Sequence, residues 1–203
     1  AVIGKVATAR PHGGLAYERF TPDGPIALLP EGEHYGFVWT LEPARAQEML
    51  ALSDDAFVAC FASHFGRRRS DFLRAWGRKS FPLVMEFARP PVAARIVAIG
   101  NASQTLHPVA GQGLNLGLGD VACLARVVAE REPWRELGDP RLLNRYARER
   151  EAPVRAMMAA TDGLLRLFAH PAPWARELRN RGLGLVDAAQ PIKRWLAARA
   201  LGQ

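Results

Sequence analysis

The residues with the clearest capacity for chemistry form one uninterrupted run, from Arg95 to Asp120 (RIVAIGNASQTLHPVAGQGLNLGLGD). The pattern predicts a short apolar strand from Ile96 to Ile99, a polar loop after Gly100 and a helix from about Leu114. A strand that leads into a helix through glycines leaves the first helical N–H groups without intrahelical partners, at the positive end of the helix dipole. Such junctions bind electron-rich ligands.

The order of residues from Gly100 to Asp120 also resembles a known sequence motif. It is similar to the second flavin-contacting motif of the p-hydroxybenzoate-hydroxylase-like FAD-dependent monooxygenases, and a dozen positions match in one register without a gap. Within this family the run most resembles the ubiquinone-biosynthesis ring hydroxylases (2-polyprenyl-6-methoxyphenol hydroxylase-like), where Asn follows the glycine. Residues 15–30 and 37–41 resemble the family's central sheet segment, and residues 145–151 and 161–170 resemble its C-terminal helices.

The resemblance implies that the loop contacts FAD. Asn101 would hydrogen-bond a ribityl hydroxyl, Pro108 would lie against the isoalloxazine ring, and N–H groups near Leu114 and Asn115 would face the N1/C2 carbonyl edge of that ring. An alternative for Asn101 is a turn-forming residue after a glycine. The expected cofactor-binding residues are Gly100, Asn101, Pro108, Gly111, Gln112, Gly113, Leu114 and Asn115.

Two other polar residues of the run have different expected roles. His107 is a candidate general base, but the resemblance requires no base there, and we favour a hydrogen bond within the loop. Asp120 falls two turns into the helix, so we expect it to hold a neighbouring element rather than to contact the cofactor. Gly117 and Gly119 are expected to permit close packing of the helix.

The activity implied by the resemblance is aromatic hydroxylation. NAD(P)H reduces FAD, oxygen gives a flavin C4a-hydroperoxide, and a phenol receives the hydroxyl group. The expected substrate is a polyprenyl phenol of ubiquinone biosynthesis. Two alternatives remain open: the same chemistry on a soluble phenolic compound, and a non-catalytic interaction module that retains the fold.

One motif of the family is missing from the 203 residues. Members hold the ADP half of FAD with a strand, a G-x-G-x-x-G turn and a helix. Gly13 and Gly14 have no helical pattern after them, whereas Gly182 and Gly184 lie inside a helical tract. Because the chain also opens within an expected strand, the sequence predicts the C-terminal part of a longer enzyme.

Composition predicts a folded cytoplasmic protein with an uneven charge. Hydrophobic residues make up 49% and the net charge is +7, while no apolar run reaches the length of a membrane span. Cys60 and Cys123 are expected to be buried structural thiols, and no metal site is expected. Residues 126–203 carry 15 Lys or Arg against 9 Asp or Glu. This excess favours an ordinary solvated helix face, with peripheral contact to the inner membrane face or a biosynthetic complex as alternatives and no nucleic acid.

The expected fold class is α/β, and α+β within this piece. Residues 1–92 are expected to form a substrate-binding domain with an antiparallel sheet and helices, residues 93–130 the second FAD-contacting motif, and residues 131–203 a helical region. Strands from Leu15 to Phe20 and from Ile26 to Leu29 are the candidate substrate-binding segments.

The remaining elements follow from turn and capping signals. One helix is expected to open at Pro43, and a second to be capped by Ser53. A last strand of the first domain is expected within Ser80–Pro90. Helices are expected from about Pro140 to the end, with Pro153 in the first turn of one of them.

Overall fold

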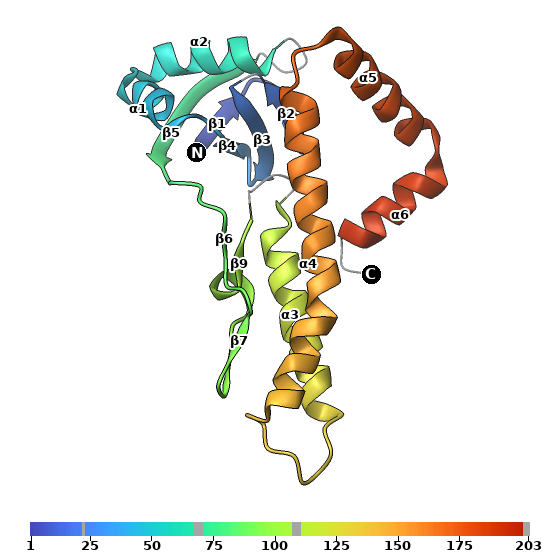
Figure 1. Ribbon diagram of the computed structural model, residues 1–203. Coiled ribbons are helices and arrows are strands. Elements are labelled where there is room, and N and C mark those ends of the chain that lie inside the picture. Colours follow the sequence, from blue (N-terminus) through green and yellow to red (C-terminus); the bar gives the residue numbers. More distant parts are fainter. Residues whose placement is uncertain (22, 67–70, 107–110, 201–203) are drawn as a thin grey trace. The chain divides into compact units, whose positions relative to one another are not determined.

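The structure is a computed structural model that describes residues 1–21, 23–66, 71–106 and 111–200 (Figure 1). Contacts divide the chain into two compact units, Ala1–Leu83 and Val84–Gln203. The functional division into residues 1–92, 93–130 and 131–203 stays a prediction, because contacts alone do not assign a role to a segment.

The first unit is built on an antiparallel sheet with the strand order β2-β3-β4-β1-β5. Its strands are β1 (Val2–Thr8), β2 (Tyr17–Thr21), β3 (Gly24–Glu31), β4 (His34–Trp39) and β5 (Phe72–Ser80). The predicted meander of β2, β3 and β4 is confirmed. In β4 the side chains of Tyr35, Phe37 and Trp39 are buried while the intervening ones are half-buried, as expected for a sheet with one covered face.

Two helices cover that face, α1 (Pro43–Ala51) and α2 (Asp54–Phe65) (Figure 1). The predicted cap is confirmed, because the Ser53 hydroxyl accepts the Ala56 N–H at 3.3 Å. Phe57, Phe61 and Phe65 recur every four residues on α2 and are buried against the sheet. Burial of these aromatic side chains is the main stabilising contribution of the unit.

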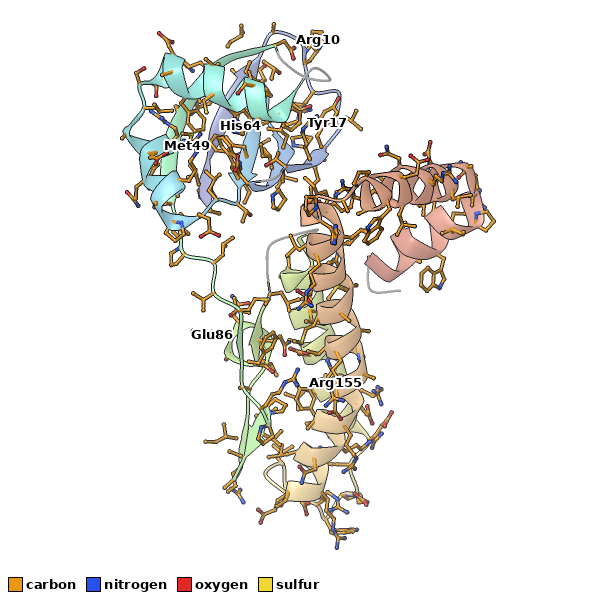
Figure 2. The ribbon with its side chains drawn as sticks, turned by 45° about the horizontal axis from the view of Figure 1, so that its top comes forward. Arg10, Tyr17, Met49, His64, Glu86 and Arg155 are labelled. Carbon is orange, nitrogen blue, oxygen red and sulfur yellow. The ribbon has the colours of Figure 1, made fainter. Side chains whose placement is uncertain are left out.

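The two cysteines are free thiols, as expected, but they differ in burial. Cys123 is buried, and burial raises the pKa of its thiol. Cys60 was expected to be buried and is only half-buried, because its position on α2 faces the edge of the core. Its Sγ lies 3.6 Å from the Sδ of Met49, and Met49 and His64 are both marked in Figure 2.

The prediction of a strand within Ser80–Pro90 is confirmed only in part. The last strand of the sheet is β5, which ends at Ser80, and only Glu86–Phe87 (β6) of the predicted tract pairs with another strand. Phe72 and Ala75 of β5 are buried, but Leu73 and Arg74 between them are both exposed, and the pairing of β5 with β1 has register shifts. These features hide the period-2 apolar pattern from which strands are recognised.

The second unit contains short strand pairs followed by helices. Strand β6 pairs with β9 (Gln104–Thr105), and β7 (Val92–Ala93) pairs with β8 (Ile96–Val97). The predicted strand Ile96–Ile99 thus ends two residues early, before the 3₁₀ turn Gly100–Ala102. The helices are α3 (Gly113–Ala129), α4 (Pro140–Ala169), α5 (Pro173–Ala188) and α6 (Gln190–Ala200).

Pro153 lies inside α4 and not in the first turn of a helix, so that prediction was wrong. The helix begins at Pro140, where the Asp139 carboxylate accepts the Arg141 N–H at 2.7 Å. An interior proline removes one backbone hydrogen bond at a cost of about 3 kcal/mol. The burial of Leu142 and Tyr146 on α4 against α3 offsets this cost.

Candidate functional site

A buried carboxylate on α3 holds the predicted flavin loop in place. Asp120 on α3 is 1% exposed, and its Oδ2 accepts the Gly100 N–H at 2.9 Å and the Gln104 Nε2–H at 2.7 Å. Its Oδ1 accepts the Arg150 Nε–H of α4 at 2.6 Å. The expected role of Asp120 is confirmed, since it holds the loop and a second helix in place.

The glycines of α3 allow this close arrangement. A Cβ on Gly117 would lie 3.4 Å from the Cα of Gly100, and a Cβ on Gly119 would lie 3.1 Å from the Arg150 guanidinium. A Cβ on Gly117 would touch the loop backbone, and a Cβ on Gly119 would need the guanidinium to shift by a few tenths of an ångström. The prediction that these glycines permit close packing is confirmed.

The start of α3 is open toward a ligand. Gly111 has φ +60°, in the left-handed region that favours glycine. A Cβ on Gly111 or Gly113 would meet no atom of the described residues within 4 Å. Gln112 makes no side-chain cap hydrogen bond to the helix, and the first turn of the helix holds no acidic residue. The Leu116 N–H donates to the Gln112 carbonyl at 2.9 Å. The N–H groups of the residues before Leu116 therefore come before this i to i−4 hydrogen bond of the helix.

Asn101 lies at the surface in the 3₁₀ turn beside α3. It lines a shallow cavity of about 450 Å³ together with Glu86, Phe87 and Ser103. The amide is therefore accessible, which a ligand contact requires and a purely turn-forming role does not.

The predicted cofactor-binding residues that the structure describes lie on or beside the first turns of α3, where Gly100 approaches the helix at Gly117 and Asp120. Gly100 and Asn101 lie on the turn beside this helix, and residues 111–115 form its start. His107 and Pro108 lie outside the described residues. Sequence reasoning missed the supporting roles of Gln104 and Arg150. The signal was Asp120 itself, because an acidic residue on the buried side of an amphipathic helix requires polar partners.

Strand β3, which contains one of the candidate substrate-binding segments, has one buried face and one partly exposed face. Ile26 and Leu28 are fully buried under α1 and α2, so they are part of the core. Ala27 is half-buried and Leu29 is 51% exposed. Any contact of β3 with a substrate would therefore come from the face that carries Ala27 and Leu29.

These features fit FAD at the start of α3. The flavin ring is electron-rich when reduced, and an uncapped helix start without acidic side chains supplies positive potential. The open space beside Gly113 would be filled by a Cβ, so a planar group can approach the backbone there. The residues that would hold the cofactor are Asn101 and the backbone of 111–115.

Comparison with known proteins agrees with this geometry. Residues 4–161 match the family model described as FAD binding domain. The chain therefore belongs to the FAD-binding-domain family.

Relatives in this family are named as hydroxylases. Ubiquinone hydroxylase UbiL of Rhodospirillum rubrum is 36% identical over 204 residues, covering 100% of this chain and 48% of that protein. The 3-demethoxyubiquinol 3-hydroxylase of Escherichia coli is 32% identical, covering 94% of this chain and 49% of that protein. The chain thus spans about half the length of these relatives.

A solved structure supports the fold alone. p-Nitrophenol 4-monooxygenase PnpA from Pseudomonas putida has a TM-score of 0.70 at 16% identity, covering 98% of this chain and 51% of that one. The expected mixed α/β fold with an antiparallel sheet is confirmed.

Proposed function

We propose that the protein hydroxylates an aromatic ring with FAD as its cofactor, and that the substrate is a polyprenyl phenol of ubiquinone biosynthesis. The observation that carries this proposal is the glycine-flanked, uncapped start of α3, held against its loop by Asp120. The names of the relatives, ubiquinone hydroxylase and 3-demethoxyubiquinol 3-hydroxylase, support the proposed reaction class and substrate class.

The chain's own part in this reaction is binding and orientation. When bound, FAD supplies the redox and oxygen chemistry, with NADH or NADPH as the reductant. The Asn101 amide would hydrogen-bond a cofactor hydroxyl. The N–H groups of Gly113 and Leu114 would stabilise negative charge on the adjacent ring edge. Asp120 acts through the backbone, because it fixes Gly100 relative to α3.

The proposal is tested by product analysis on the whole protein that its gene encodes, loaded with FAD. NADH or NADPH, oxygen and a short-chain prenyl phenol are supplied, and the hydroxylated product is measured by mass spectrometry. Reductant oxidation alone is insufficient, since it also reports wasted reduction of oxygen. Absence of product with bound and reducible flavin would exclude the hydroxylase proposal.

The same assay separates the alternatives. A matched phenol without the prenyl chain should react at a lower kcat/KM if the substrate is prenylated. Equal values for the two phenols would favour a soluble phenolic substrate. A protein that binds no flavin at all would instead favour the non-catalytic interaction module.

Contact with a membrane surface is part of this proposal, because a prenylated substrate resides in the lipid bilayer. In the described residues, no helix is both long and apolar enough to span a membrane. Helices α5 and α6 nevertheless expose apolar side chains, among them Trp174 (61%), Leu185 (69%) and Trp195 (60%). They lie in the basic third of the chain, a combination suited to the surface of an anionic bilayer. A docking site for a biosynthetic complex is the alternative.

A further inference from the structure

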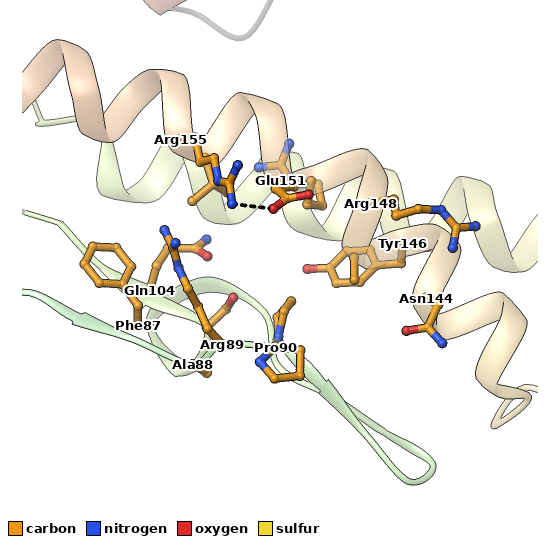
Figure 3. A pocket seen from close by; sticks show the side chains of 15 residues that line it. Phe87, Ala88, Arg89, Pro90, Gln104, Asn144, Tyr146, Arg148, Glu151 and Arg155 are labelled. Atoms are coloured by element: carbon orange, nitrogen blue, oxygen red, sulfur yellow. Dashed lines mark ion pairs between the residues drawn. The ribbon is translucent and has the colours of Figure 1, made fainter.

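A cavity of about 270 Å³ lies within the second unit, between α4 and the segment from Phe87 to Pro91 (Figure 3). Buried Ser103 and Gln104 contribute to its lining. The side chain of Asn101, which the proposed function uses, is not among the lining residues. It shares Phe87, Ala88 and Ser103 with the cavity beside Asn101, but its charged lining residues do not line that cavity.

Positive charge dominates the lining. Arg89, Arg148, Arg150 and Arg155 line the cavity, and Glu151 is the one lining carboxylate among the described residues. Arg150 is paired with the buried Asp120, and Arg155 pairs with Glu151 at 2.7 Å between Nη2 and Oε1. In the part of the chain that the structure describes, Arg89 and Arg148 make no ion pair. The four arginines therefore carry two more charges than the two carboxylates that pair with them.

Arg89 and Arg155 reach the cavity from opposite walls (Figure 3). The Arg89 guanidinium lies over the Phe87 ring at 5.6 Å and donates to the Sδ of Met158 at 3.4 Å, which is a weak bond. The Arg155–Glu151 pair is exposed, at 63% and 55% for the two side chains. Exposed pairs contribute little to stability, so Glu151 can yield Arg155 to a stronger anion.

Part of the remaining lining is apolar. Phe87 and Pro90 on one wall, and Val154 on α4, offer surfaces against which a ring can pack. Guanidinium groups bind phosphate in a bidentate way, more strongly than they bind a neutral acceptor. The volume is close to the lower end of small-molecule sites.

We propose that this cavity binds a ring-bearing phosphate of mononucleotide size. Arg89 and Arg155 hold the phosphate, the ring packs on Phe87 and Pro90, and Glu151 competes with the phosphate for Arg155. The proposal is independent of flavin binding and of hydroxylation. It can therefore fail while the proposed function stands, and the reverse also holds.

The test is a calorimetric titration of the FAD-loaded protein with uridine monophosphate at low salt. This nucleotide lacks the adenine of FAD, and the bound FAD occupies the cofactor site. Uridine and inorganic phosphate are titrated in parallel. We expect saturable one-to-one binding of the monophosphate, with uridine and phosphate each weaker by about tenfold or more.

Variants separate this site from adventitious binding. Arg89→Gln and Arg155→Gln should each weaken binding by about tenfold. Glu151→Gln should tighten it, because the competing carboxylate is removed. Arg141→Gln, an exposed arginine of α4 outside the cavity, is the matched control and should change nothing. No saturable binding, or binding by Arg89→Gln and Arg155→Gln that is as tight as that of the unchanged protein, would overturn the proposal.

Discussion

The Asp120 carboxylate and the Arg150 guanidinium form a salt bridge of 2.6 Å, with side chains that are 1% and 11% exposed. This pair joins α3 to α4, and the same carboxylate holds Gly100 and Gln104. A single buried anion thus sets the position of the loop relative to two helices. Removal of either charge would leave the other buried and uncompensated.

Asp120→Ala should therefore lower the free energy of unfolding by about 3 kcal/mol or more. Urea unfolding followed by circular dichroism measures this change. Asp162→Ala, which breaks the exposed Arg166–Asp162 pair of α4, is the matched control and should cost about 0.5 kcal/mol or less. In the double variant Asp120→Ala/Arg150→Met, the loss should be smaller than the sum of the two single losses. Additive losses would mean that the two residues act independently.

Gly113→Val should reduce flavin content while the fold survives. A Cβ at this position meets no atom of the described residues within 4 Å, so the added side chain enters the space proposed for the cofactor. Gly163→Val is the matched control, since Gly163 is also helical and also has open space around its Cβ. Flavin absorbance per protein and the melting temperature are measured for both variants. Normal flavin content in Gly113→Val would place the ring elsewhere.

The start of α3 and the role of Asp120 could be predicted from the sequence, whereas the contacts that support them could not. The glycine run specified the start of α3 to within one residue, because chain direction, glycines and apolar period agree there. Asp120 was assigned correctly from helical spacing alone. Its partners were not, because Arg150 lies 30 residues away and only tertiary packing brings it close.

Two elements were predicted incorrectly for physical reasons that the sequence does not display. In strand β5 the buried residues Phe72 and Ala75 are three positions apart, so the period-2 pattern is lost, and register shifts interrupt the pairing with β1. Pro153 is a helix-breaking residue whose local preference is overridden by the burial of Tyr146 and its neighbours on α4. In both elements, tertiary contacts rather than the local sequence pattern determine the secondary structure.

Acid should destabilise the packing of α3 on α4. Hydrogen bonds from Arg126 and then Arg145 hold the pKa of Glu149 below its usual value, and Arg135 lowers the pKa of Glu132 to about 2. A carboxyl pKa that is lowered by folding adds stability above the unfolded pKa, near 4.3 for Glu, and this stability is lost as pH falls toward the folded value. The urea midpoint should thus be constant from about pH 6 to 5 and fall between about pH 4.5 and 2.

The variant Glu149→Gln tests the source of that acid dependence. It should lower the midpoint at neutral pH and flatten the decline below pH 4.5, because one of the titrating groups is gone. Glu33→Gln removes a carboxylate of the first unit and serves as the control, with an unchanged profile. If both variants kept the full decline, other carboxylates would account for it.

Helices α5 and α6 should attach the protein to anionic vesicles. Basic residues near an anionic leaflet each contribute about 1 kcal/mol, and salt screens that attraction. Co-sedimentation should therefore show binding to vesicles containing phosphatidylserine at low salt, release at high salt and little binding to neutral vesicles. Trp174→Ala and Trp195→Ala should weaken attachment, because tryptophan favours the bilayer interface. Trp134→Ala, which removes an equally large side chain that is 73% exposed between α3 and α4, should have no effect. Equal sedimentation with anionic and neutral vesicles, or equal loss in all three variants, would leave these helices as a solvated surface or a docking site for proteins.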